Sequence, residues 1–253
     1  MPLQTIDDVI QALTTIVEDC EKAQSRTGYF AALYKRMTMA VKDGIAHGAF
    51  IDGSRMEKLD VTFAARYLDA HQAYLNGEVC STSWKYAFDG CSNASLTVIQ
   101  QLILGINTHI NLDLAIASAA VAPGDSIYDL ETDFNRINKV IASLFDDVQE
   151  SLEEVWPPMR LLERVGKTQE TDLLNFSIGA ARKAAWANAV LLAGANEAEQ
   201  HAYTEQMDAT VYMIAQRVIN PGVLSMTLLS VIRETEYDDT ARTIRLIDTT
   251  VVD

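Results

Sequence analysis

The chain has 253 residues, of which 49% are hydrophobic and 22% are charged, and its 35 acidic and 20 basic residues give a formal net charge of −15. This composition is typical of a globular protein and excludes an intrinsically disordered chain. The excess of negative charge disfavours contact with phosphate backbones and anionic lipids, so we expect no nucleic-acid partner and no membrane association.

Cysteine usage bears on the cellular compartment. The three cysteines show no C-x-x-C spacing. An odd number without that spacing argues against a disulfide framework and against a structural zinc site. No charged segment followed by an apolar stretch opens the chain, so we expect no signal peptide and predict a cytoplasmic protein.

Hydrophobic residues recur at a period of 3.6 along nearly the whole chain, and strand patterns are nearly absent, which predicts an all-α fold. The first helix is expected to begin near Thr5. Ser54 and Glu57 have the spacing of a capping box and predict the start of the third helix. The expected helices after the first are, in chain order, 28–46, 54–75, 82–90 and a central helix over about 95–121.

The second half of the chain shows the same periodicity. A long helix is predicted from Ser126 to about Val155, where Pro157 and Pro158 prevent its continuation. Further helices are predicted over 170–193, 197–219 and 222–248. Because no repeat and no low-complexity linker interrupts the chain, we predict a single domain over residues 1–253, a bundle of about eight helices around a buried central helix.

The central helix is almost uncharged. From Ser92 to Gly124, Asp113 is the only formally charged side chain. The segment nevertheless holds too many polar residues for a lipid-spanning helix, so we expect it to be buried in protein. A buried carboxylate is destabilising by several kcal/mol unless it is paired or ligates a cation, so Asp113 requires a partner. The candidates are His109, four residues earlier, and Arg66 and Arg182, each in a largely apolar helix.

The polar residues of this helix fall on two faces. Helical geometry places His109 and Asp113 on one face and Asn107 and Asn111 on nearly the opposite one. One hypothesis is a hydrogen-bond network that only specifies how the helices pack. The other is a pocket in which His109 transfers a proton and Asp113 orients it. In the second hypothesis the residues expected to contact the substrate are Asn107, Asn111, Arg66, Trp84, Arg182 and Trp186.

A metal ion is a further candidate, because His and Asp four residues apart on a helix can converge on one ion. This hypothesis is a metal-dependent hydrolase in which His109, Asp113 and Asp133 hold one divalent ion. Asp133 could equally lie on a solvated face and pair with Arg136. The four histidines of the chain are too few for a trinuclear zinc site. No phosphate-binding glycine motif occurs, so no nucleotide cofactor is expected.

Arg182 and Trp186 are four residues apart, and we expect the guanidinium of Arg182 to stack on the indole of Trp186.

From the polar residues of the central helix, the leading hypothesis is a small-molecule enzyme or binding protein with a buried polar pocket at this helix. The alternatives are the metal-dependent hydrolase and a non-catalytic helical structural or interaction module, whose polar network only specifies packing within one chain or in a homodimer.

Residues 105–114 read Gly-Ile-Asn-Thr-His-Ile-Asn-Leu-Asp-Leu. This segment matches the signature G-[MI]-N-A-H-I-N-x-D-L, with Thr108 in place of the usual alanine. On this motif the chain resembles a bacterial and fungal family of unknown function, the DUF5995-like proteins. The resemblance extends over Phe63–Tyr67, Ser83–Phe88 and Asp133-Phe134, and over Arg182 with Trp186. It implies an all-helical fold and names no biochemical role.

Overall fold

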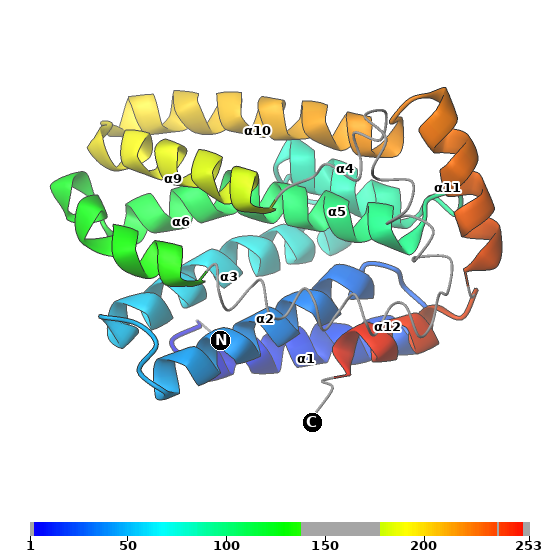
Figure 1. The fold of residues 1–253 in the computed structure, drawn as a ribbon, viewed down its shortest axis with the longest axis horizontal. Helices are drawn as coiled ribbons and strands as arrows, with labels where there is room; N and C mark the ends of the chain where they lie inside the picture. The colour runs from blue at the N-terminus through cyan, green and yellow to red at the C-terminus, as the bar shows by residue number, and fades with distance from the viewer. Residues whose placement is uncertain (1–2, 138–177, 237, 250–253) are drawn as a thin grey trace.

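The computed structural model describes residues 3–137, 178–236 and 238–249. Every regular element within these residues is a helix, which confirms the predicted all-α fold (Figure 1). The elements are α1 (Ile6–Ala23), α2 (Gly28–Ala46), α3 (Gly53–Asn76), α4 (Thr82–Cys91), α5 (Val98–Thr108), the π-helix η1 (His109–Asp113), α6 (Leu114–Val121), the 3₁₀ turn η2 (Gly124–Ser126), a helical stretch over 127–137, α9 (Ile178–Gly194), α10 (Glu197–Ile219), α11 (Val223–Thr235) and α12 (Thr240–Asp248).

The central helix predicted over about 95–121 is present as α5, η1 and α6 in continuous succession. Other helices surround it: α2 and α3 lie on one side, α9 and α10 lie on the other, and α4 packs against both α5 and α10 (Figure 1). Val98–Val121 is long and apolar enough to cross a membrane, but 89% of its 18-residue apolar window is buried inside the protein. A helix that is apolar on all sides is expected at the centre of a bundle, and this one forms the centre of the hydrophobic core.

Helix starts follow from capping residues, and one of them differs from the prediction. Thr5 begins α1 with a capping box in which Asp8 is the reciprocal partner. The predicted capping box of Ser54 and Glu57 is wrong, because Asp52 is the N-cap of α3 and accepts a hydrogen bond from the Arg55 amide at 2.9 Å. Asp and Ser cap helices about equally well, so the earlier of two candidates can begin the helix.

The last predicted helix, 222–248, is in fact two helices. The first, α11, ends at Thr235, and Asp239 then caps α12 by accepting a hydrogen bond from the Arg242 amide at 2.8 Å. This break turns the chain so that α12 packs on α1 and α2 (Figure 1). The predicted helix over 126–155 is described only to residue 137, and its remainder and residues 170–177 lie outside the described residues.

Candidate functional site

The backbone changes its hydrogen-bond pattern where the signature segment lies. Residues 109–113 form a π-helix, in which the Leu114 amide donates to the His109 carbonyl five residues back. Such π turns are rare and occur often at functional sites. The turn directs His109 and Asp113 toward α3 and α4, while Asn111 faces α9 and α10. The two predicted polar faces are therefore present.

Asp113 is 1% exposed and accepts hydrogen bonds from three different elements. The Arg66 Nε of α3 donates to Oδ1 at 2.9 Å. Oδ2 lies 2.8 Å from Trp84 Nε1 of α4 and 3.1 Å from His109 Nδ1. The prediction that Asp113 is buried and paired is confirmed. Arg66, rather than Arg182, is the arginine that compensates its charge.

His109 is fully enclosed by aromatic side chains. Its ring stacks on Phe63, with centroids 3.6 Å apart, and meets the edge of Tyr34 at 4.4 Å. Burial lowers the pKa of His109, and the nearby Asp113 opposes this effect only in part, which favours a neutral imidazole. An ionised carboxylate only accepts hydrogen bonds, so Nδ1 carries the proton. Nε2 is then a buried base, and it has no hydrogen-bond partner among the described residues.

A cavity of about 40 Å³ lies between α2 and α3, and we call it the Asp60 cavity. Its wall includes Tyr34 and Phe63, the two rings nearest the imidazole of His109. Three polar lining atoms, Tyr34 Oη, Thr38 Oγ1 and Asp60 Oδ2, are buried. The Tyr34 and Thr38 side chains interact with each other, whereas Asp60 Oδ2 has no hydrogen-bond partner in the described part of the chain. Burial raises the pKa of Asp60 to about 8, so its carboxyl is protonated at neutral pH. This volume is sufficient for a few water-sized groups.

Sequence reasoning did not predict Asp60, Tyr34 and Thr38 as site residues, although it did predict Arg182, which also lines the Asp60 cavity. Asp60 lies one turn from Met56 and from Ala64 on the buried face of α3, and Tyr34 and Thr38 lie one turn apart on α2. This spacing was a usable signal for Asp60, since a carboxylate within a buried stripe needs an explanation. For Tyr34 and Thr38 there was no such signal, because both residue types are common inside helices.

Arg182 and Trp186 do not form the predicted pair. The Arg182 guanidinium lies over the ring of Phe134, 4.5 Å from its centroid, and donates from Nη2 to the Phe134 carbonyl at 2.8 Å. Trp186 packs instead against Phe134, and the centroids of the two rings are 4.9 Å apart. The prediction of stacking on Trp186 is wrong, because Phe134 occupies the position between the two side chains. Arg182 does line the Asp60 cavity.

Of the three predicted metal ligands, His109 and Asp113 lie in contact, but Asp133 does not join them. The Asp133 carboxylate is fully buried and accepts hydrogen bonds from the amides of Ile51 at 2.7 Å and Asp52 at 2.9 Å. It thereby fixes the loop before α3, so its predicted place on a solvated face is also wrong. In residues 3–137, 178–236 and 238–249 no group of three or more His, Cys, Asp or Glu residues is placed to hold a metal.

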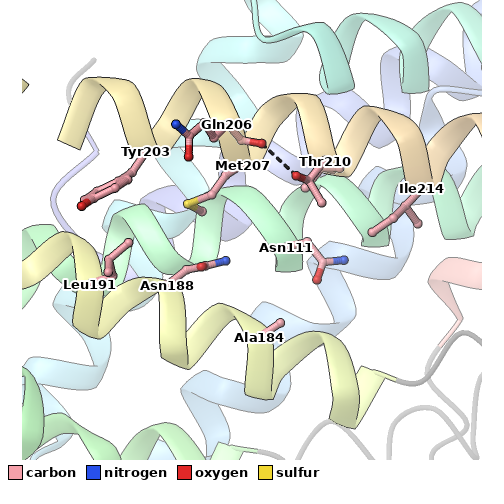
Figure 2. Close-up of a pocket in the computed structure, with 10 residues that line it drawn as sticks. Asn111, Ala184, Asn188, Leu191, Tyr203, Gln206, Met207, Thr210 and Ile214 are labelled. Carbon is pink, nitrogen blue, oxygen red and sulfur yellow. Dashed lines mark hydrogen bonds between the residues drawn. The ribbon is translucent and has the colours of Figure 1, made fainter. Parts of the chain in front are cut away.

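Asn107 and Asn111 lie apart from the His109 side of the helix. Asn107 Nδ2 donates to the Val211 carbonyl of α10 at 3.0 Å, and Asn111 Nδ2 donates to Asn107 Oδ1 at 3.0 Å. Asn111 lines a groove between α9 and α10 (Figure 2). The single pocket predicted from the sequence is therefore divided by the central helix into two separate regions.

Comparison with known proteins places the chain in a family. The model of a family of unknown function, DUF5995, matches residues 6–221. The chain belongs to this family. No curated protein and no solved structure matches it.

The DUF5995 match covers both polar regions. Every residue of the Asp113 network and of the Asp60 cavity lies within 6–221, as does the groove between α9 and α10. Of the described helices, α11 and α12 follow the matched range. The resemblance inferred from residues 105–114 is confirmed at the level of the family, and DUF5995 membership assigns no reaction.

Proposed function

We propose that this protein binds a small polar molecule in the Asp60 cavity and transfers a proton to or from it through His109. The observation that supports this most directly is the placement of the imidazole. Its Nδ1 lies 3.1 Å from the Asp113 carboxylate, which would hold the proton there, and its Nε2 is buried and without a partner in the described residues. Orienting carboxylates of this kind fix the tautomer of catalytic histidines and stabilise the imidazolium that forms.

The environments of His109 and Asp60 suit opposite roles. Burial lowers the pKa of His109, which keeps it ready to accept a proton. Burial raises the pKa of Asp60 to about 8, which keeps a proton available to donate. Two titratable groups whose surroundings shift their protonation in this way form a pair of general base and general acid. The hydroxyls of Tyr34 and Thr38, which line the same cavity, would orient a ligand between His109 and Asp60.

Two aromatic side chains, Phe63 and Tyr34, line the Asp60 cavity and contact His109. Phe63 stacks on the imidazole and also forms part of the cavity wall. Phe63 is only partly buried, unlike Tyr34, the next nearest ring to the imidazole. Rotation of the Phe63 ring would join the Asp60 cavity to Nε2, and ligand binding would favour that arrangement.

The test is a comparison of the wild type with His109→Gln. Each protein is incubated with a mixture of small metabolites that carry hydroxyl, carbonyl or amide groups, and mass spectrometry follows the bound and consumed compounds. We expect the wild type to retain or convert at least one compound that His109→Gln does not. His201→Gln, at an exposed position beside Glu205, should behave as the wild type.

Two results contradict the proposal. One is equal binding or conversion by the wild type and His109→Gln. The other is a wild type that neither retains nor converts any compound while His109→Gln unfolds, which would assign His109 to packing alone.

A further inference from the structure

A groove of about 310 Å³ lies on the other side of the π-helix, between α9 and α10 (Figure 2). The helix α9 packs mainly on α6 and η1, and α10 packs mainly on α4 and α5, so the two share few contacts with each other. The helices α9 and α10 therefore pack on the central helix side by side with a gap between them, and Asn111 of the π-helix lies at this gap. The volume is at the lower end of the range for small-molecule pockets.

The groove is uncharged, although the chain carries 35 acidic and 20 basic residues. None of its ten lining residues is charged. Carboxamides come from three elements: Asn111 from η1, Asn188 from α9 and Gln206 from α10. The nearby acid Asp208 does not belong to the lining, because its carboxylate accepts hydrogen bonds from the amides at the start of α4.

The orientation of Asn111 is fixed from inside the protein. The Val211 carbonyl can only accept, so Asn107 must present its Nδ2 there and its Oδ1 to Asn111. Asn111 in turn must donate from Nδ2, and this leaves its Oδ1 and its second N–H for a ligand. Asn107 is fully buried, so this relay is shielded from water. The carboxamide that faces the groove is thus held in one arrangement before any ligand arrives.

The chemistry of the lining defines a class of ligand. A carboxamide presents a donor and an acceptor side by side, which matches adjacent hydroxyl groups, since each hydroxyl both donates and accepts. The Tyr203 ring, Leu191 and Met207 supply apolar surface for C–H groups (Figure 2). A charged ligand would lose hydration without gaining an opposite charge. We propose that this groove is a second binding site and that it takes a neutral, hydroxyl-rich molecule of the size of a monosaccharide or a cyclitol.

The experiment observes the ligand-binding groups directly. Side-chain amide signals of ¹⁵N-labelled protein are recorded by NMR during titration with D-glucose and, separately, with myo-inositol. We expect one of these probes to shift the signals of Asn111, Asn188 and Gln206 with a dissociation constant of about 1 mM or tighter. Glucosamine and glucuronate, which are charged, should bind more weakly.

Two variants and a second neutral probe complete the design. Asn188→Ala should weaken binding about tenfold, the usual effect of one lost hydrogen bond in such a site. Gln216→Ala is the matched control, since Gln216 lies on α10 outside the groove and bonds to Tyr212. The proposal is overturned if neither neutral probe shifts the three signals, if charged sugars bind as well, if Asn188→Ala has no effect, or if a capped neutral tripeptide binds more tightly.

This site is independent of the proposed function. His109→Gln should leave the titration of the groove unchanged, because His109 contacts α2 and α3 rather than α9 or α10. Failure of the groove to bind sugars would therefore leave the proposed role of His109 intact. Equally, a His109 without binding or catalytic activity would leave the proposed sugar site intact.

Discussion

Asp113 shows how a single carboxylate is accommodated in an apolar interior. Its two oxygens receive donors from Arg66, Trp84 and His109, and the arginine alone supplies a full opposite charge. Arg66 keeps 34% of its side chain exposed, so part of its guanidinium remains hydrated. The network therefore satisfies the carboxylate without burying a second charge completely, which is the arrangement that limits the desolvation penalty.

Neutralising this carboxylate should be strongly destabilising. Asp113→Asn removes the partner of Arg66 and places an amide group against the N–H donors of Trp84 and His109. We expect the free energy of unfolding, measured with urea, to fall by about 3–4 kcal/mol, the lower part of the range for broken buried pairs, because Arg66 is partly hydrated.

The same substitution at Asp89 is the control. Asp89 pairs with Lys85 at the surface, with both side chains largely exposed. Asp89→Asn should leave the unfolding midpoint unchanged. Equal effects of the two substitutions would contradict the role assigned to Asp113.

At the scale of elements, Gly105 allows the aromatic side chains to approach the central helix. A Cβ built at Gly105 would lie 2.5 Å from two atoms of the Phe30 ring. That ring also contacts Tyr67, Trp84 and His109, with centroids 5.1, 5.6 and 5.7 Å away. The position of His109 thus depends on a residue without a side chain one turn earlier.

Gly105→Ala should therefore displace Phe30 and loosen the enclosure of His109. We expect a loss of about 1–3 kcal/mol in stability, as for other overpacked cores, together with a change in the His109 ring signals in NMR spectra. Gly194→Ala is the matched control, because no atom lies within 4 Å of a Cβ built there. An unchanged Gly105→Ala protein would contradict this account of the packing.

Most elements could be predicted because periodicity and caps are local properties. The helix over 28–46 and the helix over 197–219 have the predicted bounds. The π-helix could not be predicted, since one extra residue in a turn leaves no mark on an apolar sequence. The Asp113 network was predictable because a lone charge in an apolar segment needs a partner. Asp60 was not recognised despite its place in the stripe with Met56 and Ala64, because the other charged residues of α3 make the helix look like an ordinary surface helix.

At the scale of the whole molecule, buried carboxyl groups shape the dependence of stability on pH. Burial raises the pKa of Asp60 to about 8 and that of Glu236 to about 7. A carboxyl with a raised pKa keeps its proton in the folded chain while the unfolded chain loses it. Its contribution to stability is therefore complete below the unfolded pKa, near 3.8 for Asp60, and is lost as the pH rises toward 8.

Asp60→Asn should remove this dependence at one position. At and below about pH 3.8 the two proteins should be similarly stable, because Asp60 is neutral there in the folded chain and largely neutral in the unfolded chain, and asparagine has nearly the same shape. Between that pH and about pH 8 the wild type should lose stability relative to the variant, by at most about 1.4 kcal/mol per pH unit. Urea unfolding at several pH values measures the difference, and parallel curves for the two proteins would show that Asp60 is ionised in the folded state.

The protonation state of His109 tests the central claim most directly. In NMR spectra of protein labelled with ¹⁵N in the histidine rings, the account predicts a proton on Nδ1, an unprotonated Nε2 and a pKa below the ordinary value of about 6.5. A proton on Nε2, or a pKa at or above that value, would contradict it, because the buried base on which the proposed function depends would then be absent.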